Sequence, residues 1–560
     1  MSSQRARVAT TLCLLAGLLL VAEAGAQQPT AAPSRALTAP TASMARAHLR
    51  FLSHDLLGGR APGTPGAEIA ARYIASQFEL LGLEPGAPDG SYLQPVNLIG
   101  TTPEPSLVLG VGPRTTSFDY LTEFVAWSAR PEESVTVDGD VVFVGYGIEA
   151  PAWGWDDYKS TSLTGKILLM LVNDPGLTDS SRFNGRALTY YGRWTYKLEQ
   201  AARLGAVGAI LIHTDESATY PWSVVRNSWS GEQIQLDRAP HESLRFGAWI
   251  TQEAARSMMA AAGRDYDLLV RRAQQRQFRP MALDAHAVVH IRNRVRRIQS
   301  FNVVARVPGG DPEGSQEAVV LTSHYDHLGT GIPVAGDSIY NGAQDNASGV
   351  AALLAVGAGL AGAGPLPRRS ILLVATTAEE SGLLGAQAYT QAPPVPLEHT
   401  AAAINIDRAN VRGPTRDAVA LGAERSAILA YVERAWASEG VGLSPDPNPH
   451  AGQFYRSDHL AFARAGIPVV SLRPGSAFAD QPADWGAAQE REYVAHRYHQ
   501  PSDEFRDDFN YQGLLQQVRL MVRLAWDLAA TADFPAWNRD SEFRPAGEQL
   551  RLRRLRETTH

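Results

Sequence analysis

From about residue 300 onward, short apolar runs alternate with helix-like segments, and this alternation restricts the fold more than any other feature of the chain. The predicted strands are 318–322, 370–376, 401–406 and 468–472, and the predicted helices are 349–360, 383–389, 426–438 and 511–530. Apolar strands that are separated by crossover helices form parallel sheets whose two faces are covered. We therefore predict an α/β fold with a mostly parallel mixed sheet and helices on both faces.

The preceding residues divide into two segments of different character. Residues 43–126 begin with two predicted helices, the second of which starts at Thr64-Pro65 and ends at Gly82. Residues 127–290 contain strand-like runs at 135–144, 166–172 and 209–212, and we interpret them as an inserted, mostly β, non-catalytic domain. In this division, 43–126 and 291–532 form one domain, 127–290 form the insert, and 533–560 are a charged, peripheral tail.

The first 26 residues have the pattern of an export signal. Arg5 and Arg7 precede an apolar run at 8–22, and Ala24-Gly25-Ala26 forms a small-x-small cleavage site. The run is shorter than the roughly 20 residues that a membrane-spanning helix needs, although an uncleaved anchor is the alternative. We predict a signal peptide at 1–26, a flexible leader at 27–42, and a periplasmic or secreted protein without a stable membrane span.

Composition argues against nucleic-acid binding and against stabilisation by disulfide bonds. The formal net charge of the 560-residue chain is -7, so it lacks the basic field with which nucleic-acid-binding proteins gather phosphates. Cys13 is the only cysteine and lies within the predicted signal peptide. The mature protein would therefore contain no disulfide bond, even though export usually permits one.

Polar residues collect just after the predicted strands, where ligands of open α/β sheets bind. These residues are His324, Asp326, Asp345, Glu379, Glu380, Asp407 and His499. Each one alone has a structural explanation, such as a helix N-cap for Asp345. Their joint position at one predicted sheet edge favours a shared chemical role.

Two histidines and three carboxylates suit zinc, which accepts imidazole nitrogen and carboxylate oxygen. Five ligands are too many for a single catalytic zinc with an open position, but they suit two zinc ions that share one carboxylate. We predict that His324 and Asp407 bind one ion, that Glu380 and His499 bind the other, and that Asp345 bridges them.

The remaining acidic residues have supporting roles in this interpretation. A ligating histidine normally donates its second ring N–H to an oxygen acceptor, and Asp326 is placed to accept from His324. Glu379 is free to act as general base if its neighbour Glu380 binds metal. Structural or supporting roles are assigned to His327, Asp458 and His459.

At these motifs the sequence resembles the di-zinc aminopeptidase family of bacterial leucyl aminopeptidase and aminopeptidase Y. The matching elements are His324-Tyr-Asp326, Asp345-Asn346-Ala-Ser-Gly349, Glu379-Glu380, Asn405-Ile-Asp407 and Tyr498-His499, and the similarity extends over about residues 43–530. The insert resembles a protease-associated domain, through Gly165-Lys166-Ile-Leu-Leu-Met and the helix–strand unit at 201–212.

The resemblance implies the same division of the five ligands, with two zinc ions per chain. It also implies that Glu379 is the catalytic base, that Tyr498 assists the oxyanion, and that the Asp345–Asn346 peptide bond is cis. The implied reaction is hydrolysis of the N-terminal residue of a peptide with a free terminus by a metal-bridged water. Arg408 departs from the family, since many relatives have an apolar residue there, and it leaves a simple leucine specificity open.

Three other functions stay open from the sequence. A carboxypeptidase or dipeptidase could use the same two-zinc site. A glutaminyl cyclase has a similar fold but a single zinc ion, and a non-catalytic ectodomain could bind a partner through the insert. The sequence predicts no oligomeric state.

Overall fold

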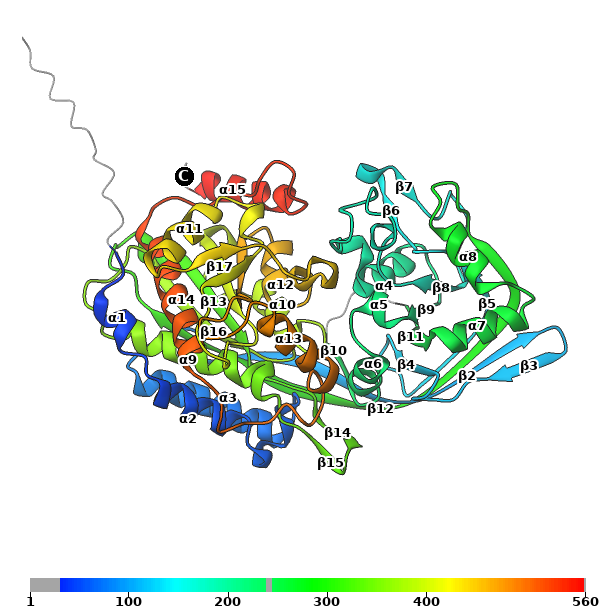
Figure 1. Ribbon diagram of the computed structural model, residues 1–560, viewed down its shortest axis with the longest axis horizontal. Helices are drawn as coiled ribbons and strands as arrows, with labels where there is room; N and C mark the ends of the chain where they lie inside the picture. Colours follow the sequence, from blue (N-terminus) through cyan, green and yellow to red (C-terminus); the bar gives the residue numbers. More distant parts are fainter. Residues whose placement is uncertain (1–30, 238–243, 558–560) are drawn as a thin grey trace, which may run out of the picture.

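The larger domain is built around a sheet of mixed direction in the computed structural model, which describes residues 31–237 and 244–557 (Figure 1). β13 pairs in parallel with β16 and β17, and β17 pairs in parallel with β20. The outer strands β18 and β12 run antiparallel to their neighbours β20 and β16. The order is β19 (Gly442–Ser444), β18 (Asp417–Leu421), β20 (Val469–Pro474), β17 (Thr400–Ile406), β13 (Ala318–His324), β16 (Ser370–Thr376) and β12 (Met281–Val307). The predicted mostly parallel α/β sheet is confirmed.

Helices cover both faces of this sheet because successive residues of its strands point to opposite sides. In β13, Val319 and Leu321 belong to one hydrophobic cluster and Val320 to another. The first cluster includes helices α2 (Ala42–Leu52), α3 (Pro65–Leu80), α9 (Ser348–Leu360), α11 (Leu429–Ser438) and α14 (Gln512–Ala530). The second includes α10 (Leu384–Gln391), α12 (His459–Arg464) and α15 (Arg544–Glu557).

Both ends of the described chain are more ordered than the sequence indicates. The expected leader at 27–42 contains helix α1 (Ser34–Thr38), whose Ala36 is fully buried and belongs to the same cluster as α9. The expected peripheral tail packs on the larger domain, because Trp537 is buried and its indole donates to the carbonyl of Gly466 at 2.9 Å. The predicted signal peptide lies outside the described residues.

The inserted domain contains as much helix as strand, so the expectation of a mostly β insert is wrong. Its strands are β5 (Ser134–Phe143), β8 (Ile167–Leu171), β9 (Gly208–His213), β11 (Phe246–Thr251) and β4 (Phe124–Ser128). Its helices are α4 (Trp194–Arg203), α5 (Asp215–Ala218), α6 (Trp222–Trp229), α7 (Gln252–Ala261) and α8 (Tyr266–Ala273). β5, β8, β9 and β11 run parallel, which requires crossover segments. Helix α4 lies in the crossover from β8 to β9, and α5 and α6 lie in the crossover from β9 to β11.

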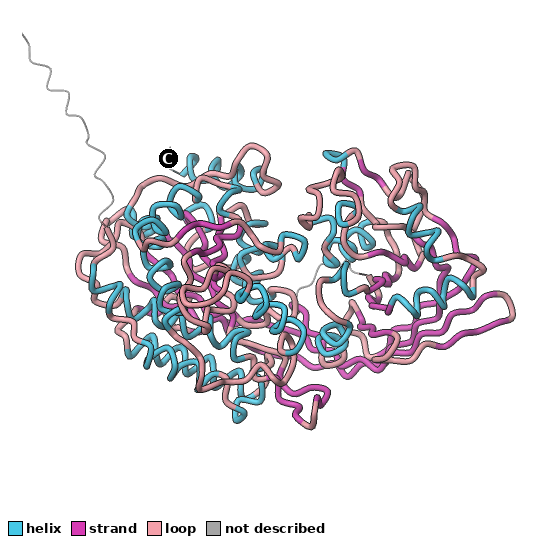
Figure 2. The backbone as a smooth tube through the Cα atoms, viewed as in Figure 1, coloured by secondary structure: helices cyan, strands magenta, loops and turns pink. Residues whose placement is uncertain are grey.

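A two-stranded ribbon joins the two domains. β2 (Leu93–Val111) pairs antiparallel with β12 from Leu93↔Val303 to Gly110↔His286. β12 also pairs with β16 in the larger domain and with β5 in the inserted domain. The strands of the ribbon extend beneath both domains (Figure 2). The domain boundary predicted at residue 290 therefore lies in the middle of a continuous strand.

Short elements complete the fold. They are β1 (Glu84–Pro85), β3 (Arg114–Ser117), β6 (Glu149–Ala150), β7 (Trp155–Asp156), β10 (Gln233–Leu236), β14 (Gly329–Val334), β15 (Asp337–Tyr340) and helix α13 (Trp485–His496). β10 pairs with β2, which anchors the segment after α6 to the ribbon. Within residues 31–237 and 244–557, no helix combines the length and apolar character needed to cross a membrane.

Candidate metal centre

The structure brings all five predicted ligands to one edge of the larger sheet. His324 ends β13, Asp407 follows β17, and Glu380 lies in the loop after β16. Asp345 precedes α9, and His499 follows α13. Four of these residues are between 1% and 8% exposed, and the side chain of Glu380 is 8% exposed. Their common position follows from the parallel strands, whose carboxyl ends meet at the same edge.

Asp345 stands between two separate pairs of donors. Its Oδ1 lies 3.3 Å from Nε2 of His324, which is also 3.5 Å from Oδ1 of Asp407. Its Oδ2 lies 3.7 Å from Nε2 of His499, which is 3.0 Å from Oε2 of Glu380. Each oxygen of Asp345 thus faces one histidine, as a carboxylate that bridges two cations would.

The donor set fits zinc. The Nε2 atoms of His324 and His499 are buried and make no hydrogen bond of normal geometry with any described residue. Ligand atoms of His324, Asp345 and Glu380 lie within 4.8 Å of one another, and so do those of His324, Glu379 and Asp407. Imidazole nitrogen and carboxylate oxygen in a buried cluster are donors that zinc prefers, and a cation would satisfy both orphaned nitrogens.

Asp326 supports the centre in a different way from the one predicted. Nδ1 of His324 lies 3.2 Å from the main-chain carbonyl oxygen of Asp326 and 3.9 Å from its carboxylate. The carboxylate accepts the backbone N–H groups of Glu379 at 3.1 Å and of Glu380 at 3.3 Å. Asp326 therefore fixes the turn that carries both glutamates, and burial raises its pKa to about 7.

Two residues that orient ligands were missed or underestimated from the sequence. Nδ1 of His327 lies 2.7 Å from Oε1 of Glu380, so this histidine holds the carboxylate of a predicted ligand. The signal for His327 was its place in the run that begins at His324. Ser228 of the inserted domain lies 2.8 Å from Nδ1 of His499. No sequence signal could have found Ser228, because it is 271 residues away from its partner.

The turn before α9 is held from two sides. The carboxylate of Asp503 accepts the N–H groups of Gln344 at 3.1 Å and of Asp345 at 3.0 Å. The buried guanidinium of Arg60 donates to four main-chain carbonyls, those of Leu52, Tyr325, Asn341 and Gly342. The Asp345–Asn346 peptide bond is cis, as the resemblance implied.

The surroundings shift the pKa values of the two adjacent glutamates in opposite directions. Burial raises the pKa of Glu379 well above its usual value, and the charges of Glu380 and Asp407 add to this against the opposing effect of His324. Burial acts in the same sense on Glu380, but the imidazoles of His499 and His327 outweigh it and hold the pKa of Glu380 well below its usual value. A carboxyl pair separated in this way is typical of sites in which one member handles protons.

A family model decides the identity of the larger domain. Residues 302–525 match the model described as peptidase family M28. Residues 302–525 form an M28 peptidase domain. The five predicted ligands, His324, Asp345, Glu380, Asp407 and His499, are called the metal cluster below. They lie within this segment, together with Glu379 and Tyr498.

Known proteins resemble parts of the chain. Leupeptin-inactivating enzyme 1 of Streptomyces exfoliatus is 26% identical over 243 residues, which is 42% of this chain and 50% of that enzyme. A vacuolar membrane protease of Coccidioides posadasii is 34% identical over 106 residues, 19% of this chain and 9% of the protease. The chain thus matches half or less of the length of these relatives.

The structure also resembles a solved one. An aminopeptidase from Aneurinibacillus sp. strain AM-1 superposes with a TM-score of 0.52 at 18% identity, covering 89% of this chain and 97% of the other. At that identity the likeness shows a shared fold. It extends over both domains, since the M28 segment alone is much shorter than the covered share.

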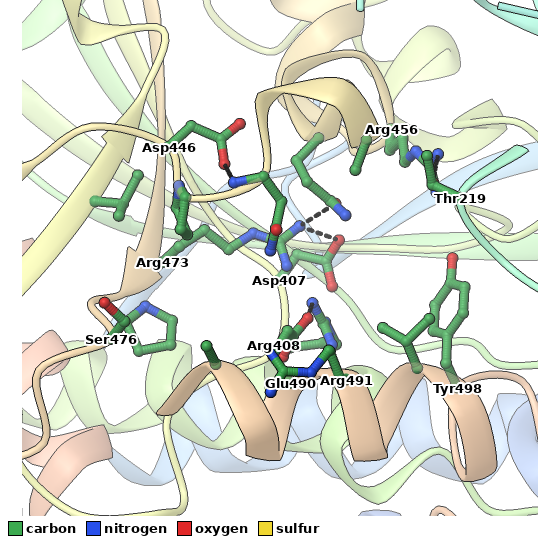
Figure 3. A pocket seen from close by; sticks show the side chains of 18 of the residues that line it. Thr219, Asp407, Arg408, Asp446, Arg456, Arg473, Ser476, Glu490, Arg491 and Tyr498 are labelled. Atoms are coloured by element: carbon green, nitrogen blue, oxygen red, sulfur yellow. Dashed lines mark hydrogen bonds and ion pairs between the residues drawn. The ribbon is translucent and has the colours of Figure 1, made fainter. Parts of the chain in front are cut away.

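A cavity of about 790 Å³ lies between the M28 domain and the inserted domain, directly over the metal cluster (Figure 3). Asp345, Glu380 and Asp407 line it from the M28 domain, and Thr219 and Tyr220 line it from the inserted domain. The arginines that line it are Arg186, Arg408, Arg412, Arg456, Arg473 and Arg491. Any substrate that reaches the cluster therefore contacts both domains.

Arg408 and Arg473 differ in how their charges are used. The guanidinium of Arg408 donates to Glu490 of α13 at 2.8 Å and lies 4.8 Å from the ring centre of Tyr493. Its charge is therefore already paired. Arg473 lies 3.7 Å from Oδ2 of Asp407 and lines the cavity beside the cluster. The cation that departs from the family pattern in the sequence is thus not the one closest to the ligands.

Proposed function

We propose that this chain is an exported, two-zinc aminopeptidase that hydrolyses the N-terminal residue from peptides. The observation that carries the proposal is the position of Asp345, whose two carboxylate oxygens face two separate histidine–carboxylate pairs. Export rests on residues 1–26, and the intact mass of the mature protein checks it, since cleavage after Ala26 leaves Gln27 first.

The residues of the M28 domain would hold two zinc ions. His324 and Asp407 would bind one, Glu380 and His499 would bind the other, and Asp345 would bind both. Bound zinc supplies Lewis acidity, which lowers the pKa of water toward neutrality and polarises a carbonyl. His327 contacts the carboxylate of Glu380, and the carboxylate of Asp326 accepts the backbone N–H of Glu379. Together they hold the turn that carries both glutamates.

Glu379 is the group that would move the proton. It lies beside the ligand atoms of His324 and Asp407, and the residue is 7% exposed. Because burial raises its pKa, Glu379 accepts a proton from water readily and returns it to the leaving amine. Tyr498 lines the same cavity, and burial raises the pKa of its phenol. The phenol therefore stays protonated and can donate to an oxyanion.

Selection of the N-terminus follows from charge. The carboxylate of Glu379, which binds neither ion in this proposal, lines the cavity, and an α-ammonium group is attracted to a carboxylate. The same cavity contains arginines, and Arg473 lies next to Asp407. This second feature favours the rival function, a carboxypeptidase or dipeptidase, which would bind the α-carboxylate of its substrate.

Blocked peptides separate these functions. We expect hydrolysis of a free tripeptide to be abolished by N-acetylation and retained after C-terminal amidation, as followed by mass spectrometry of the products. Enzyme treated with a chelator is the control, and activity that returns on adding zinc ties cleavage to the metal. Equal cleavage of the acetylated peptide, with loss on amidation, would replace the aminopeptidase with a carboxypeptidase.

A further inference from the structure

The inserted domain touches the metal cluster through the end of helix α6. The hydroxyl of Ser228 lies 2.8 Å from Nδ1 of His499. The side-chain amide of the preceding residue, Asn227, donates to the main-chain carbonyl of His499 at 3.1 Å and to the side chain of Gln500 at 3.2 Å. Two adjacent residues of the inserted domain thus hold the ring and the backbone of one predicted ligand.

The ring contact determines which nitrogen of His499 can bind metal. Coordination through Nε2 requires the proton to be on Nδ1, and Ser228 Oγ is positioned to accept that N–H. His324 has the corresponding partner within its own loop, the carbonyl of Asp326. His499 differs because its partner comes from the other domain.

The backbone contact acts on an unusual conformation. His499 has φ of 55°, in the left-handed region that residues with a side chain seldom adopt. Such a conformation persists where neighbouring groups hold it. Asn227 contributes to this through its bond to the His499 carbonyl, so α6 fixes the direction from which the imidazole approaches the cluster.

Helix α6 is itself held firmly. Trp229 stacks on Trp127 with 4.1 Å between ring centres and meets Trp194 edge-on at 5.0 Å. The indole of Trp222 donates to the carbonyl of Leu121 at 3.0 Å, and Gln233 donates to the carbonyl of Ser228 at 3.2 Å. The contact at His499 therefore depends on the position of the inserted domain as a whole.

We propose that α6 is a positioning element of the metal centre and that Ser228 orients His499 for one of the two metal positions. This inference rests on the proposed two-zinc function. It assigns the inserted domain a part in metal binding in addition to its part in lining the cavity. Because coupling between two equilibria is reciprocal, zinc in the Glu380–His499 position also stabilises the docked inserted domain.

The test compares three variants with the wild type. Ser228→Ala removes the hydroxyl, Ser228→Thr retains it, and Ser230→Ala changes a serine whose contact with Tyr120 is made by its main-chain carbonyl. Alanine favours helix more than serine does, so Ser228→Ala should not unfold α6. Zinc affinity is measured by competition with a chromogenic chelator, and the thermal midpoint is measured with and without zinc.

We expect Ser228→Ala to bind one of its two zinc ions about 10- to 100-fold more weakly, the usual effect of losing the partner of a ligating histidine. The increase in thermal midpoint on adding zinc should shrink as well. Ser228→Thr and Ser230→Ala should bind both ions as the wild type does. Unchanged zinc affinities in a folded Ser228→Ala variant would overturn the inference.

The same measurement keeps the two proposals apart. If the wild type binds two zinc ions and Ser228→Ala has the same affinities, only the role of Ser228 fails. If the wild type binds fewer than two zinc ions at saturation, the proposed two-zinc function is contradicted. The proposed role of Ser228, which rests on that function, is then contradicted as well.

Discussion

At the residue scale, Glu379 is the group whose properties depend most on its surroundings. It lies next to Glu380 in the chain, but Glu380 faces two imidazoles, whereas Glu379 lies beside the imidazole of His324 and the carboxylate of Asp407. Burial raises the pKa of Glu379, whereas the imidazoles of His499 and His327 lower the pKa of Glu380. This difference supports the proposed roles of Glu379 as proton carrier and of Glu380 as ligand.

Replacement of Glu379 by glutamine tests that separation. We expect Glu379→Gln to bind zinc like the wild type and to lose turnover by about 10²- to 10⁴-fold, the range that a general base contributes. Turnover and zinc content are measured on the same preparation. Glu433→Gln, at an exposed position of α11, is the matched control. Turnover close to that of the wild type would remove Glu379 as the base.

The sequence predicts which residues come together at the site, but it does not predict which hydrogen bonds they form. His324, Asp345 and Asp407 could be predicted because each follows a strand or precedes a helix at a recognisable edge. The bond from His324 to the Asp326 carbonyl could not be predicted, because spacing does not distinguish a residue's carboxylate from its carbonyl. Ser228 could not be predicted either, since its contact depends on how two domains dock.

At the scale of elements, helix α3 starts against the preceding loop without room for a side chain. A Cβ added to Gly66 would lie 1.8 Å from the carbonyl oxygen of Leu57. Thr64 caps the helix and Pro65 occupies its first position, so the start of α3 cannot shift easily. The same loop carries Arg60, which donates to the turn before α9.

We expect Gly66→Ala to lower the free energy of unfolding by about 1–3 kcal/mol or more, as overpacking does. Urea unfolding monitored by circular dichroism measures the loss. Gly231→Ala is the control, because a Cβ there meets nothing within 4 Å. Equal stability of the two variants would show that α3 can move away from Leu57.

The limits of a helix or strand can be predicted where proline or glycine marks its ends, and cannot be predicted where neither does. The helix that starts at Thr64-Pro65 and ends before Gly82 was located correctly, because proline and glycine mark its limits. The predicted boundary at residue 290 falls inside β12, because no proline or glycine near that point marks a limit of the strand. Pairing on both sides carries the strand across that point.

At the scale of the whole molecule, Arg456 links the two domains across the cavity. Its guanidinium donates to Thr219 at 2.8 Å and to the carbonyl of Ala218 at 3.1 Å, both in the inserted domain. It also lies 5.2 Å from the ring centre of Tyr220. Arg456, Thr219 and Tyr220 line the cavity together, so this link helps to set its shape.

We expect Arg456→Ala to raise KM for peptide substrates several-fold and to leave both zinc affinities unchanged. Steady-state kinetics and chelator competition give the two quantities, and Arg434→Ala on the exposed side of α11 is the control. The pattern is the reverse of that expected for Ser228→Ala, in which zinc affinity changes. A KM equal to that of the wild type would mean that this link does not shape the substrate site.

The number of residues in the β2–β12 ribbon sets the distance between the two domains. A strand advances about 3.3 Å per residue, and its side chains repeat their direction every two residues. Removing two residues from each strand between the domains would keep every side chain on its original face while drawing the domains roughly 7 Å closer. Ser228 would then no longer meet His499. Changing the length of the ribbon by pairs of residues would therefore change the width of the entrance in discrete steps.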